Sequence, residues 1–419
     1  MAVKRRGRIS LVDLIKYVIV EGVIRGGPSY KSLLLGLALM GVYGLYLWVF
    51  VQHAPVFLGI DAGGMIVTGM SDSVPWGLYI AFFIFWVGVA AAGIVFGLAA
   101  YVFHHEGFRQ VAVLAEVQAI AAILIALMLL FVDVGRPIRT LILMPQLPNF
   151  PQSILDWDFI VLLTYLALNL LAYVYALKKL LVGQKPSLKF EYTFIAIAAP
   201  FAIGIHTVTA FISQALTARP FWNSSLLAPR YIATAFASGP ALLLLVLLIA
   251  ESRMGLRINF DVYRKTVYII AGSLVVGLYF TLSEVQEIFW YTTEPSKLAQ
   301  ASIVFLGKYV WWIGFLGWLW VILGVATVLL SLIPSVRNTR RGVAVLSITT
   351  VIAVICEKTL AIVVPAFTPD SLGQIVGYVP TPIEIAITIG VHAIGFMAYA
   401  ILARSVLRLM VQYQSISYT

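Results

Sequence analysis

Residues 111–132 read VAVLAEVQAIAAILIALMLLFV, an apolar run of 22 residues interrupted only by Glu116 and Gln118. A helix needs about 20 apolar residues to cross the hydrocarbon core of a bilayer. The sequence therefore predicts an all-α polytopic membrane protein with about ten transmembrane helices, arranged as two four-helix bundles plus peripheral helices. The other nine expected spans cover residues 32–51, 76–103, 158–181, 193–216, 231–250, 266–290, 309–333, 342–365 and 383–407.

The composition excludes an ordinary soluble protein. Of the 419 residues, 61% are hydrophobic and only 11% are charged, whereas soluble domains carry about 25% charged residues. The excess of basic residues is too sparse to indicate a nucleic-acid partner. Because Cys356 is the only cysteine, the chain cannot itself hold a disulfide, a thiolate-bound iron–sulfur cluster or a covalently attached c-type haem.

The distribution of basic residues predicts the topology. Of the 28 Lys and Arg residues, 21 flank one side of the expected spans. The other side carries six, among them Arg230, and Lys358 lies inside a span. The positive-inside rule then predicts a multi-pass protein of the cytoplasmic membrane with both termini in the cytoplasm.

The N-terminal region differs from the spans. Its apolar side chains fall on one helical face but are interrupted by Asp13, Lys16 and Glu21. Such a pattern is typical of an amphipathic helix on the membrane surface rather than of a cleavable signal. We therefore expect a cytoplasmic amphipathic segment over residues 1–31 and a transmembrane domain over residues 32–419. The apolar face comprises Leu11, Leu14, Ile15, Val18 and Ile19.

Ionisable residues inside a membrane are costly and indicate function. His206 and Thr209 lie three residues apart and hence on one helix face, which must turn toward the protein interior or a cavity. A histidine can exchange a proton and hydrogen-bond a carbonyl, the two requirements for handling a quinone. The alternative is a satisfied histidine that bridges helices. Because His206 and His392 are the only histidines well inside spans, a single haem is a second, weaker alternative.

Several acids accompany these residues. Glu284 and Glu287 lie three apart, so we expect two neighbouring carboxylates that share a proton; a solvated helix end is the alternative. Glu116 and Gln118 lie in the inner half of their span, where they are placed for a separate proton route that opens to the cytoplasm. Glu357 and Lys358 are adjacent, so each is expected to contact another helix rather than to pair with its neighbour.

Residues 133–157 form one of the two long outer loops. The motif DVGRP at 133–137 predicts a helix end, because Gly135 can cap the helix and Pro137 can stop it. Asp133 and Arg136 are spaced to pair at the interface. The prolines that follow argue against a regular helix in this loop and favour a rigid docking surface.

Five segments resemble the NrfD/polysulfide-reductase family of integral membrane subunits. They are PWGLYIAF at 75–82, DVGRP at 133–137, IHTVTAF at 205–211, ARPFWN at 218–223 and APRYIATAFASG at 228–239. The segments VVPAFTPD at 363–370 and YVPTP at 378–382 look most like the DsrP (HmeB) members.

This resemblance implies a menaquinone-binding subunit without haem or iron–sulfur cluster of its own. It implies an extracytoplasmic ferredoxin-like iron–sulfur partner and, for DsrP-like members, a haem-b membrane subunit, a c-type cytochrome subunit and a cytoplasmic heterodisulfide-reductase-like subunit. The implied setting is a respiratory complex of dissimilatory sulfur metabolism, with the direction of electron flow and proton translocation left open. We expect the quinone near His206, Thr209, Asp133, Arg136, Trp76, Tyr79 and Asp158, and a proton path through Glu284, Glu287 and Glu116.

Two further interpretations use the same features. Ten spans with ionisable residues near the middle of the membrane would also serve a secondary transporter, although transporters favour broken helices at matching positions of a repeat. A passive membrane anchor would need no buried acids.

Overall fold

The computed structural model describes residues 9–54, 64–216, 219, 221–291, 293, 295–308, 310–366 and 377–416. Every regular element in these residues is a helix, and ten helical stretches are long and apolar enough to cross a membrane. The predicted all-helical membrane fold is thus confirmed. The long helices are α2 (Pro28–Leu47), α4 (Leu78–Ala91), α6 (Glu106–Asp133), α8 (Ile154–Leu181), α9 (Leu188–Gln214), α10 (Leu227–Met254), α11 (Phe260–Gln286), α13 (Trp311–Leu332), α15 (Arg340–Ala366) and α16 (Pro382–Ile416).

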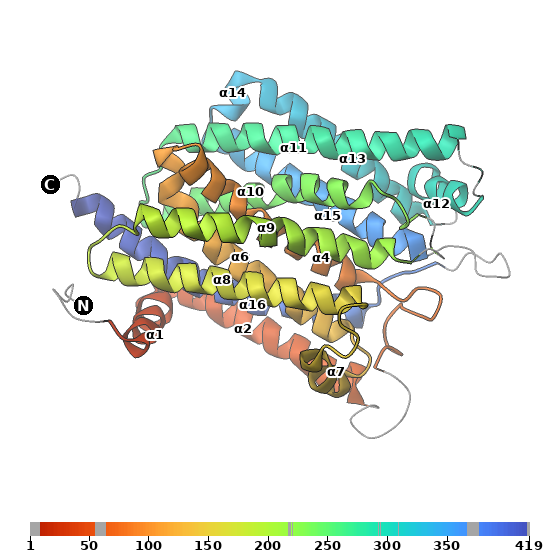
Figure 1. Ribbon diagram of the computed structural model, residues 1–419, viewed down its shortest axis with the longest axis horizontal. Coiled ribbons are helices and arrows are strands. Elements are labelled where there is room, and N and C mark those ends of the chain that lie inside the picture. The colour runs from red at the N-terminus through yellow and green to blue at the C-terminus, as the bar shows by residue number, and fades with distance from the viewer. Residues whose placement is uncertain are drawn as a thin grey trace.

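The long helices form two bundles and a peripheral pair, as the sequence predicts. Helices α4, α6, α8 and α9 pack around one another, and α10, α11, α13 and α15 form the second group. The contact between α10 and α4 joins the two bundles. Helices α2 and α16 lie together along the outside of the first bundle (Figure 1).

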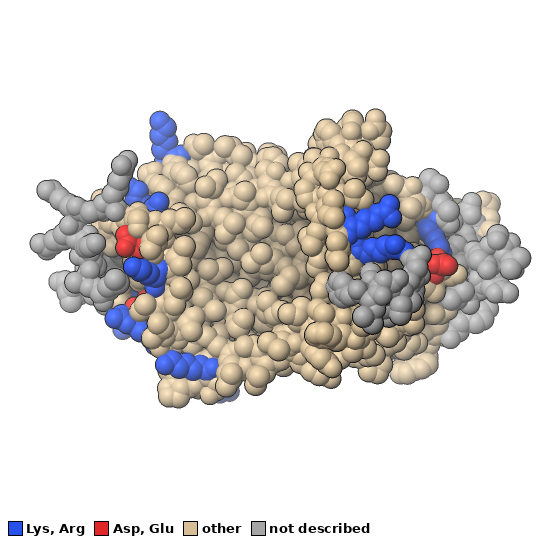
Figure 2. Space-filling model, turned by 90° about the horizontal axis from the view of Figure 1, so that it is seen from below, with Lys and Arg blue, Asp and Glu red and all other residues tan. Residues whose placement is uncertain are grey.

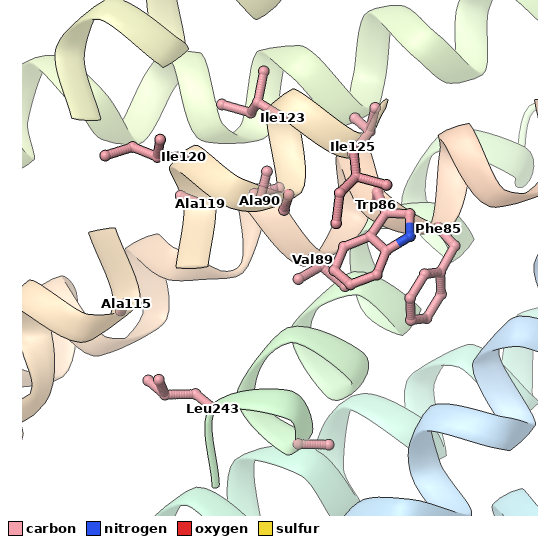
Figure 3. Close-up of a cluster of buried hydrophobic side chains, with 14 of the residues drawn as sticks. Phe85, Trp86, Val89, Ala90, Ala115, Ala119, Ile120, Ile123, Ile125 and Leu243 are labelled. Carbon is pink, nitrogen blue, oxygen red and sulfur yellow. The ribbon is translucent and has the colours of Figure 1, made fainter. Parts of the chain in front are cut away.

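Small residues allow the close approaches between helices. In lipid, helix association relies on van der Waals packing, so small side chains gather where helices touch. An added Cβ on Gly44 of α2 would lie 2.6 Å from the Cα of Gly390 of α16, so only glycine fits there. Around α4, Val89 and Ala90 belong to the same buried apolar cluster as Ala119 of α6 (Figure 3).

The second span runs over Leu78–Val102 as the sequence predicts, but its regular helix is interrupted at one residue, Ala92, whose backbone stays in the right-handed helical region. Helix α4 ends at Ala91, and the short helix α5 (Gly93–Gly97) follows it before a π-helical turn at Leu98–Val102. The break lies against α6, because an added Cβ on Gly93 would lie 3.2 Å from the carbonyl oxygen of Ala115. The Tyr165 hydroxyl of α8 donates to the Ala90 carbonyl at 3.4 Å.

The N-terminal helix α1 (Leu11–Ile19) packs on the C-terminal part of α16. The Tyr17 hydroxyl donates to the Ser405 carbonyl at 3.1 Å, and Arg404 Nε donates to the Glu21 carbonyl at 2.9 Å. Leu11 and Ile15 remain exposed, which suits a helix lying on a membrane surface; residues 1–8 of this segment lie outside the described residues. We call this end of the molecule the α1 end.

The opposite end, which we call the α7 end, corrects one sequence-based prediction and adds a helix that the sequence does not predict. The proline-rich loop contains a regular helix, α7 (Pro137–Leu143), because Pro137 occupies its first turn, where no backbone donor is needed. A further helix, α12 (Pro295–Leu306), precedes α13. Charged side chains gather at the two ends and leave an uncharged band between them (Figure 2).

A buried carboxylate fastens the α7 end. Glu384, at the start of α16, is fully buried and accepts hydrogen bonds from the backbone N–H groups of Gly69 at 3.1 Å and Leu78 at 3.2 Å. The Tyr378 hydroxyl also donates to Glu384. Burial and the nearby Glu384 carboxylate raise the pKa of Tyr378, so this hydroxyl stays protonated as a donor. The N-terminal end of α4 is thereby tied to α16.

Replacing Glu384 with alanine should lower the free energy of unfolding by about 2 kcal/mol, because buried donors lose their acceptor. The measurement is thermal unfolding of the purified protein in detergent. Glu287→Ala is the control, since Glu287 is exposed and its pair with Lys297 contributes about 1 kcal/mol or less. Equal melting temperatures for the two variants would contradict the fastening role.

Candidate functional site

A large cavity lies at the α7 end, between α2, α6, α7, α8 and α16. Its volume is about 800 Å³, within the range of sites that hold organic ligands. Most of its wall is apolar, with Trp48, Leu127 and Ile387 among the lining residues. One part of the wall is polar and comprises Arg139, Thr140, Asn149, Ser153, Asp156 and Asp158.

The two acids of this wall differ in their surroundings. Ser153 caps α8 by accepting a hydrogen bond from the Asp156 backbone, and Asp156 in turn accepts one from the Asn149 backbone at 3.0 Å. Asp156 is therefore accounted for as part of a helix start. Asp158 is 1% exposed, and its Oδ2 atom has no hydrogen-bond partner among the described residues. Such an orphaned buried carboxylate oxygen requires an explanation.

Thr209 of α9 holds the other oxygen of Asp158. Its hydroxyl lies 2.7 Å from Asp158 Oδ1 and 2.6 Å from the Ile205 carbonyl oxygen. A hydroxyl has one hydrogen, so it can donate to an ionised Asp158 or, when Asp158 carries a proton, donate to Ile205 and accept from the acid. The arrangement accommodates both protonation states of Asp158 without rearrangement.

His206 lies one turn earlier on α9 but does not line the cavity. It is fully buried against Gly88 of α4, and its ring lies 5.4 Å from that of Tyr231 of α10, centroid to centroid. Its ring makes a loose polar contact with the Tyr231 backbone, yet neither ring nitrogen has a partner in hydrogen-bond geometry. His206 thus packs between α4 and α10, as in the alternative interpretation, with the Tyr231 backbone as its one polar contact among the described residues.

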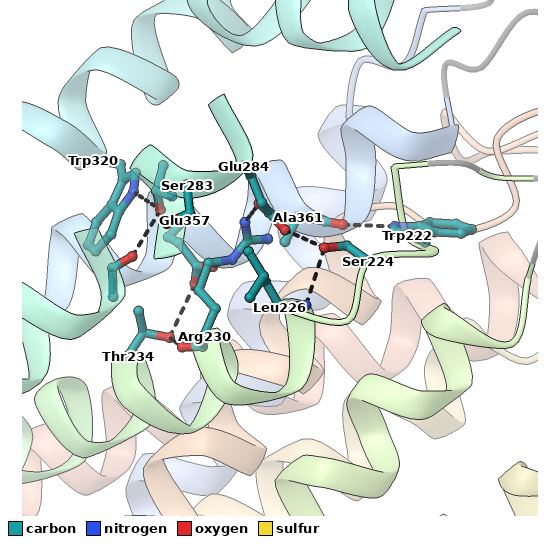
Figure 4. Close-up of polar contacts among 12 residues, drawn as sticks. Trp222, Ser224, Leu226, Arg230, Thr234, Ser283, Glu284, Trp320, Glu357 and Ala361 are labelled. Atoms are coloured by element: carbon teal, nitrogen blue, oxygen red, sulfur yellow. Dashed lines mark hydrogen bonds and ion pairs between the residues drawn. The ribbon is translucent and has the colours of Figure 1, made fainter. Parts of the chain in front are cut away.

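Beyond Tyr231 lies a group of four buried charges, which we call the charge cluster: Arg230, Glu284, Glu357 and Lys358. Figure 4 shows the first three. Arg230 of α10 pairs with Glu284 of α11, and its Nε lies 3.0 Å from Glu357 Oε1 of α15. Lys358 Nζ lies 3.2 Å from Glu357 Oε2. The formal charges sum to zero, as buried charges require.

Further contacts hold Lys358 in place. Its Nζ donates to the Thr234 hydroxyl at 2.8 Å and lies 3.7 Å from the centroid of the Tyr231 ring. The expectation that Glu357 and Lys358 avoid each other is therefore wrong, although both do contact α10 as expected. The sequence predicts Arg230 in an outer loop, but α10 begins at Leu227, three residues earlier.

The family model described as Polysulphide reductase, NrfD matches residues 66–368. The chain belongs to the NrfD family. The match covers both helix bundles, and so includes the Asp158 wall and the charge cluster.

Three relatives match over most of both chains. A putative membrane subunit of a dimethyl sulfoxide reductase from Halobacterium salinarum is 27% identical, over 86% of this chain and 87% of its own. A selenate reductase subunit from Mesobacillus selenatarsenatis is 23% identical, over 81% and 82%. The Hdr-like menaquinol oxidoreductase integral membrane subunit of Archaeoglobus fulgidus is 25% identical, over 89% and 92%.

Other residues expected at the quinone site of this NrfD protein lie beside the cavity rather than on its wall. The Tyr79 hydroxyl donates to Gln52 at 2.9 Å, and Trp76 packs on Trp222. One buried oxygen of Asp133 has no partner, and the ion pairs of the described residues include none between Asp133 and Arg136. Arg136 lies beside α7.

The expected proton-path acids of the NrfD protein are also separated. Glu284 is buried in the charge cluster, whereas Glu287 is half-exposed and pairs with Lys297 at 3.2 Å. They do not form the predicted carboxylate pair, because each has its own cation. Gln118 bonds to the Gly239 carbonyl at 2.9 Å, while Glu116 faces a small cavity beside Asn169 and keeps one buried oxygen unpaired.

His392 is the packing histidine of this NrfD protein. Trp86 Nε1 donates to His392 Nε2 at 2.9 Å, and His392 Nδ1 lies 2.7 Å from the Thr388 carbonyl oxygen. Both ring nitrogens are occupied, so the ring offers no free nitrogen to a haem iron. Within the described residues, no group of three or more His, Cys, Asp or Glu side chains is placed to hold a metal ion.

Proposed function

We propose that this protein is the quinol-reactive membrane subunit of a respiratory oxidoreductase complex, with menaquinol as its substrate. The observation that carries the proposal is the cavity of about 800 Å³ that has Asp158 among its lining residues, with one buried oxygen of that carboxylate lacking a partner. An apolar cavity with a few polar groups suits an apolar ring that carries two oxygens. The name of the Archaeoglobus relative, a menaquinol oxidoreductase subunit, supports the same substrate class.

The residues of the wall have distinct tasks in this proposal. Oxidation of a quinol releases two electrons and two protons. Asp158 accepts a proton from the quinol hydroxyl, because its free Oδ2 is an unpaired acceptor. Thr209 keeps the carboxyl group oriented in both protonation states. Arg139, on the same wall, is placed to bind the second oxygen of the ring.

Of the residues expected from the sequence, Asp158 and Thr209 are the ones we assign to substrate. His206, Trp76, Tyr79, Asp133 and Arg136 then act around the cavity rather than in it. For the protons, we propose an outward route through Glu284 with Glu287 at its exposed end. Glu116 remains the candidate for a route from the α1 end.

The names of the relatives also support partner subunits for this chain. The names of two relatives describe subunits of reductases, one of them a membrane subunit, so we propose that this chain also works with iron–sulfur and catalytic partners. We place the α7 end outside and both termini in the cytoplasm, where most basic residues lie. An extracytoplasmic ferredoxin-like subunit then docks at the α7 end, beside the cavity.

The DsrP-like segments extend the proposal to a sulfur-metabolising complex with a haem-b membrane subunit, a c-type cytochrome and a heterodisulfide-reductase-like subunit. Part of one such segment, residues 367–370, lies outside the described residues. A transporter is less well supported. Transporters favour broken helices at matching positions of a repeat. Here the helix that corresponds to the second span is α10, and it is regular from Leu227 to Met254, so the interruption at Ala92 has no match.

Filling the cavity tests the proposal. Leu127→Trp places a large ring in the cavity wall, so binding of a fluorescent hydroxyquinoline N-oxide, a quinol analogue, should weaken about tenfold or more. Leu171→Trp is the matched control, because Leu171 lies on α8 with its side chain exposed. The measurement is fluorescence quenching by the purified protein. Equal affinity in the two variants would exclude this cavity as the site.

A further inference from the structure

The charge cluster lies apart from the cavity, and none of its four residues lines the cavity where the proposed substrate binds. Four ionised groups between α10, α11 and α15 are expensive to bury, and well-packed apolar residues would stabilise such a helix contact at least as well. Ionisable residues at membrane depth therefore indicate function. The question is what a neutral set of two cations and two carboxylates can do there.

Helix α9 connects the cluster with the cavity. On one face of α9, Thr209 contacts Asp158 at the cavity wall, and His206 lies one turn away against Tyr231. The Lys358 ammonium covers the same Tyr231 ring at 3.7 Å. The order from the cavity is thus Asp158, Thr209, His206, Tyr231 and Lys358.

His206 is the unusual member of this series. Its Nδ1 and Nε2 atoms are both buried and both lack a partner in hydrogen-bond geometry. Buried polar atoms in native proteins are nearly always satisfied, so an imidazole whose one polar contact is a loose one with the Tyr231 backbone has room for a transient partner. An imidazole can accept a proton on one nitrogen and release one from the other.

The far side of the cluster borders a second, small cavity. Arg230, Glu284 and Glu357 line it together with Phe221 and Trp320. Its volume of about 40 Å³ is sufficient for water, since one water needs about 10–15 Å³ of such space. Water there would contact both carboxylates of the cluster. Ser224, in the loop before α10, donates to Glu284 at 2.9 Å.

We infer that the charge cluster is a proton-transfer site, in which Lys358 gives its proton to Glu357 and is reloaded from the His206 side. This inference rests on the proposed function, because the incoming proton is one released by quinol at Asp158. The two electrons pass to the iron–sulfur partner, and the cluster carries only the proton. His206 and Lys358 act by moving protons, while Arg230 keeps a fixed charge between the carboxylates.

The transfer balances in charge. When the Lys358 ammonium protonates the Glu357 carboxylate 3.2 Å away, an amine and a carboxylic acid result, and the cluster stays neutral. The amine then accepts a proton from the His206 side, and Glu357 releases its proton to water in the small cavity. One proton has entered and one has left. The ionisable groups around Lys358 are His206 from α9, Arg230 and Tyr231 from α10 and Glu357 from α15, with Glu284 from α11 reached through its pair with Arg230.

Lys358→Arg is the informative variant. Arginine keeps the positive charge and the neutrality of the cluster, but it does not lose its proton in proteins. We expect menadiol oxidation by the whole complex in lipid vesicles to fall on the order of a hundredfold, with unchanged binding of the hydroxyquinoline N-oxide. Lys265→Arg, at the partly exposed pair with Asp261 at the α1 end, should retain full turnover. Normal turnover in Lys358→Arg would make Lys358 a structural counter-ion and overturn the inference.

An infrared titration of the purified chain tests the cluster without substrate. We expect a carboxylic acid C=O band that changes as pH is varied across neutrality and that is lost in Glu357→Gln and in Lys358→Arg. A band that persists in both variants would overturn the inference. If the unaltered protein does not bind the quinol analogue, the proposed function fails. The infrared result still decides, independently of substrate, whether the cluster exchanges protons.

Discussion

Replacing Asp158 with asparagine will slow quinol oxidation by the whole complex on the order of a hundredfold or more, because a positioned proton acceptor contributes that much to such a step. Asparagine has the shape of aspartate and can accept the Thr209 hydrogen bond in its place. It cannot take up a proton. The cavity and its affinity for the hydroxyquinoline N-oxide should therefore be preserved while turnover is lost.

The measurement compares menadiol oxidation and analogue binding on the same preparation. Asp261→Asn is the control, because Asp261 lies at the α1 end and forms partly exposed pairs with Arg264 and Lys265. If Asp158→Asn oxidised menadiol at the rate of Asp261→Asn, the proton would have another acceptor. Loss of analogue binding in Asp158→Asn would instead assign Asp158 to binding.

Replacing Arg230 with leucine will lower the free energy of unfolding by about 3–5 kcal/mol, the usual cost of leaving a buried charge without its partner. Arg230 is 5% exposed and contacts both Glu284 and Glu357. Without it, one lysine faces two buried carboxylates. The expected result is a large loss of thermal stability in detergent and a low yield of monodisperse protein.

A second substitution makes this prediction specific. Adding Glu284→Gln to Arg230→Leu leaves Glu357 and Lys358 as a neutral pair, so much of the lost stability should return. Arg340→Leu removes an exposed pair with Glu251 at the α1 end and should cost about 1 kcal/mol or less. A double variant as unstable as Arg230→Leu would mean that lost packing, and not charge balance, explains the effect.

The fold can be predicted almost completely from the sequence, because apolar length and basic flanks are strong signals. Spans such as 111–132 agree with the helices to within several residues. The break at Ala92 cannot be foreseen, since the residues around it are as apolar as the rest of the span and the cause lies in contacts with α6 and α8. Helix α7 escapes prediction because a proline suits a helix stop and a first helical turn equally well.

The site can be predicted only in part. The spacing of His206 and Thr209 correctly places them on one face, but spacing along one helix cannot say which neighbour that face meets. Thr209 meets Asp158, and His206 meets Tyr231. The spacing of Glu284 and Glu287 likewise could not show that each carboxylate meets a different cation, Arg230 and Lys297. The position of Arg230 inside the helix could have been predicted, because it directly precedes the expected span that begins at Tyr231. In the structure α10 starts at Leu227, three residues before Arg230.

The zero net charge of the cluster has an electrical consequence. A respiratory membrane sustains a voltage, and moving one charge across it involves about 2.3 kcal/mol for roughly every 100 mV. The resting cluster, with two positive and two negative groups, feels no net force from this voltage as a whole, because the forces on Arg230 and Lys358 are opposed by those on the carboxylates paired with them. A single proton in passage does feel it. The field can thus oppose or assist the proton while the protein that conducts it stays still.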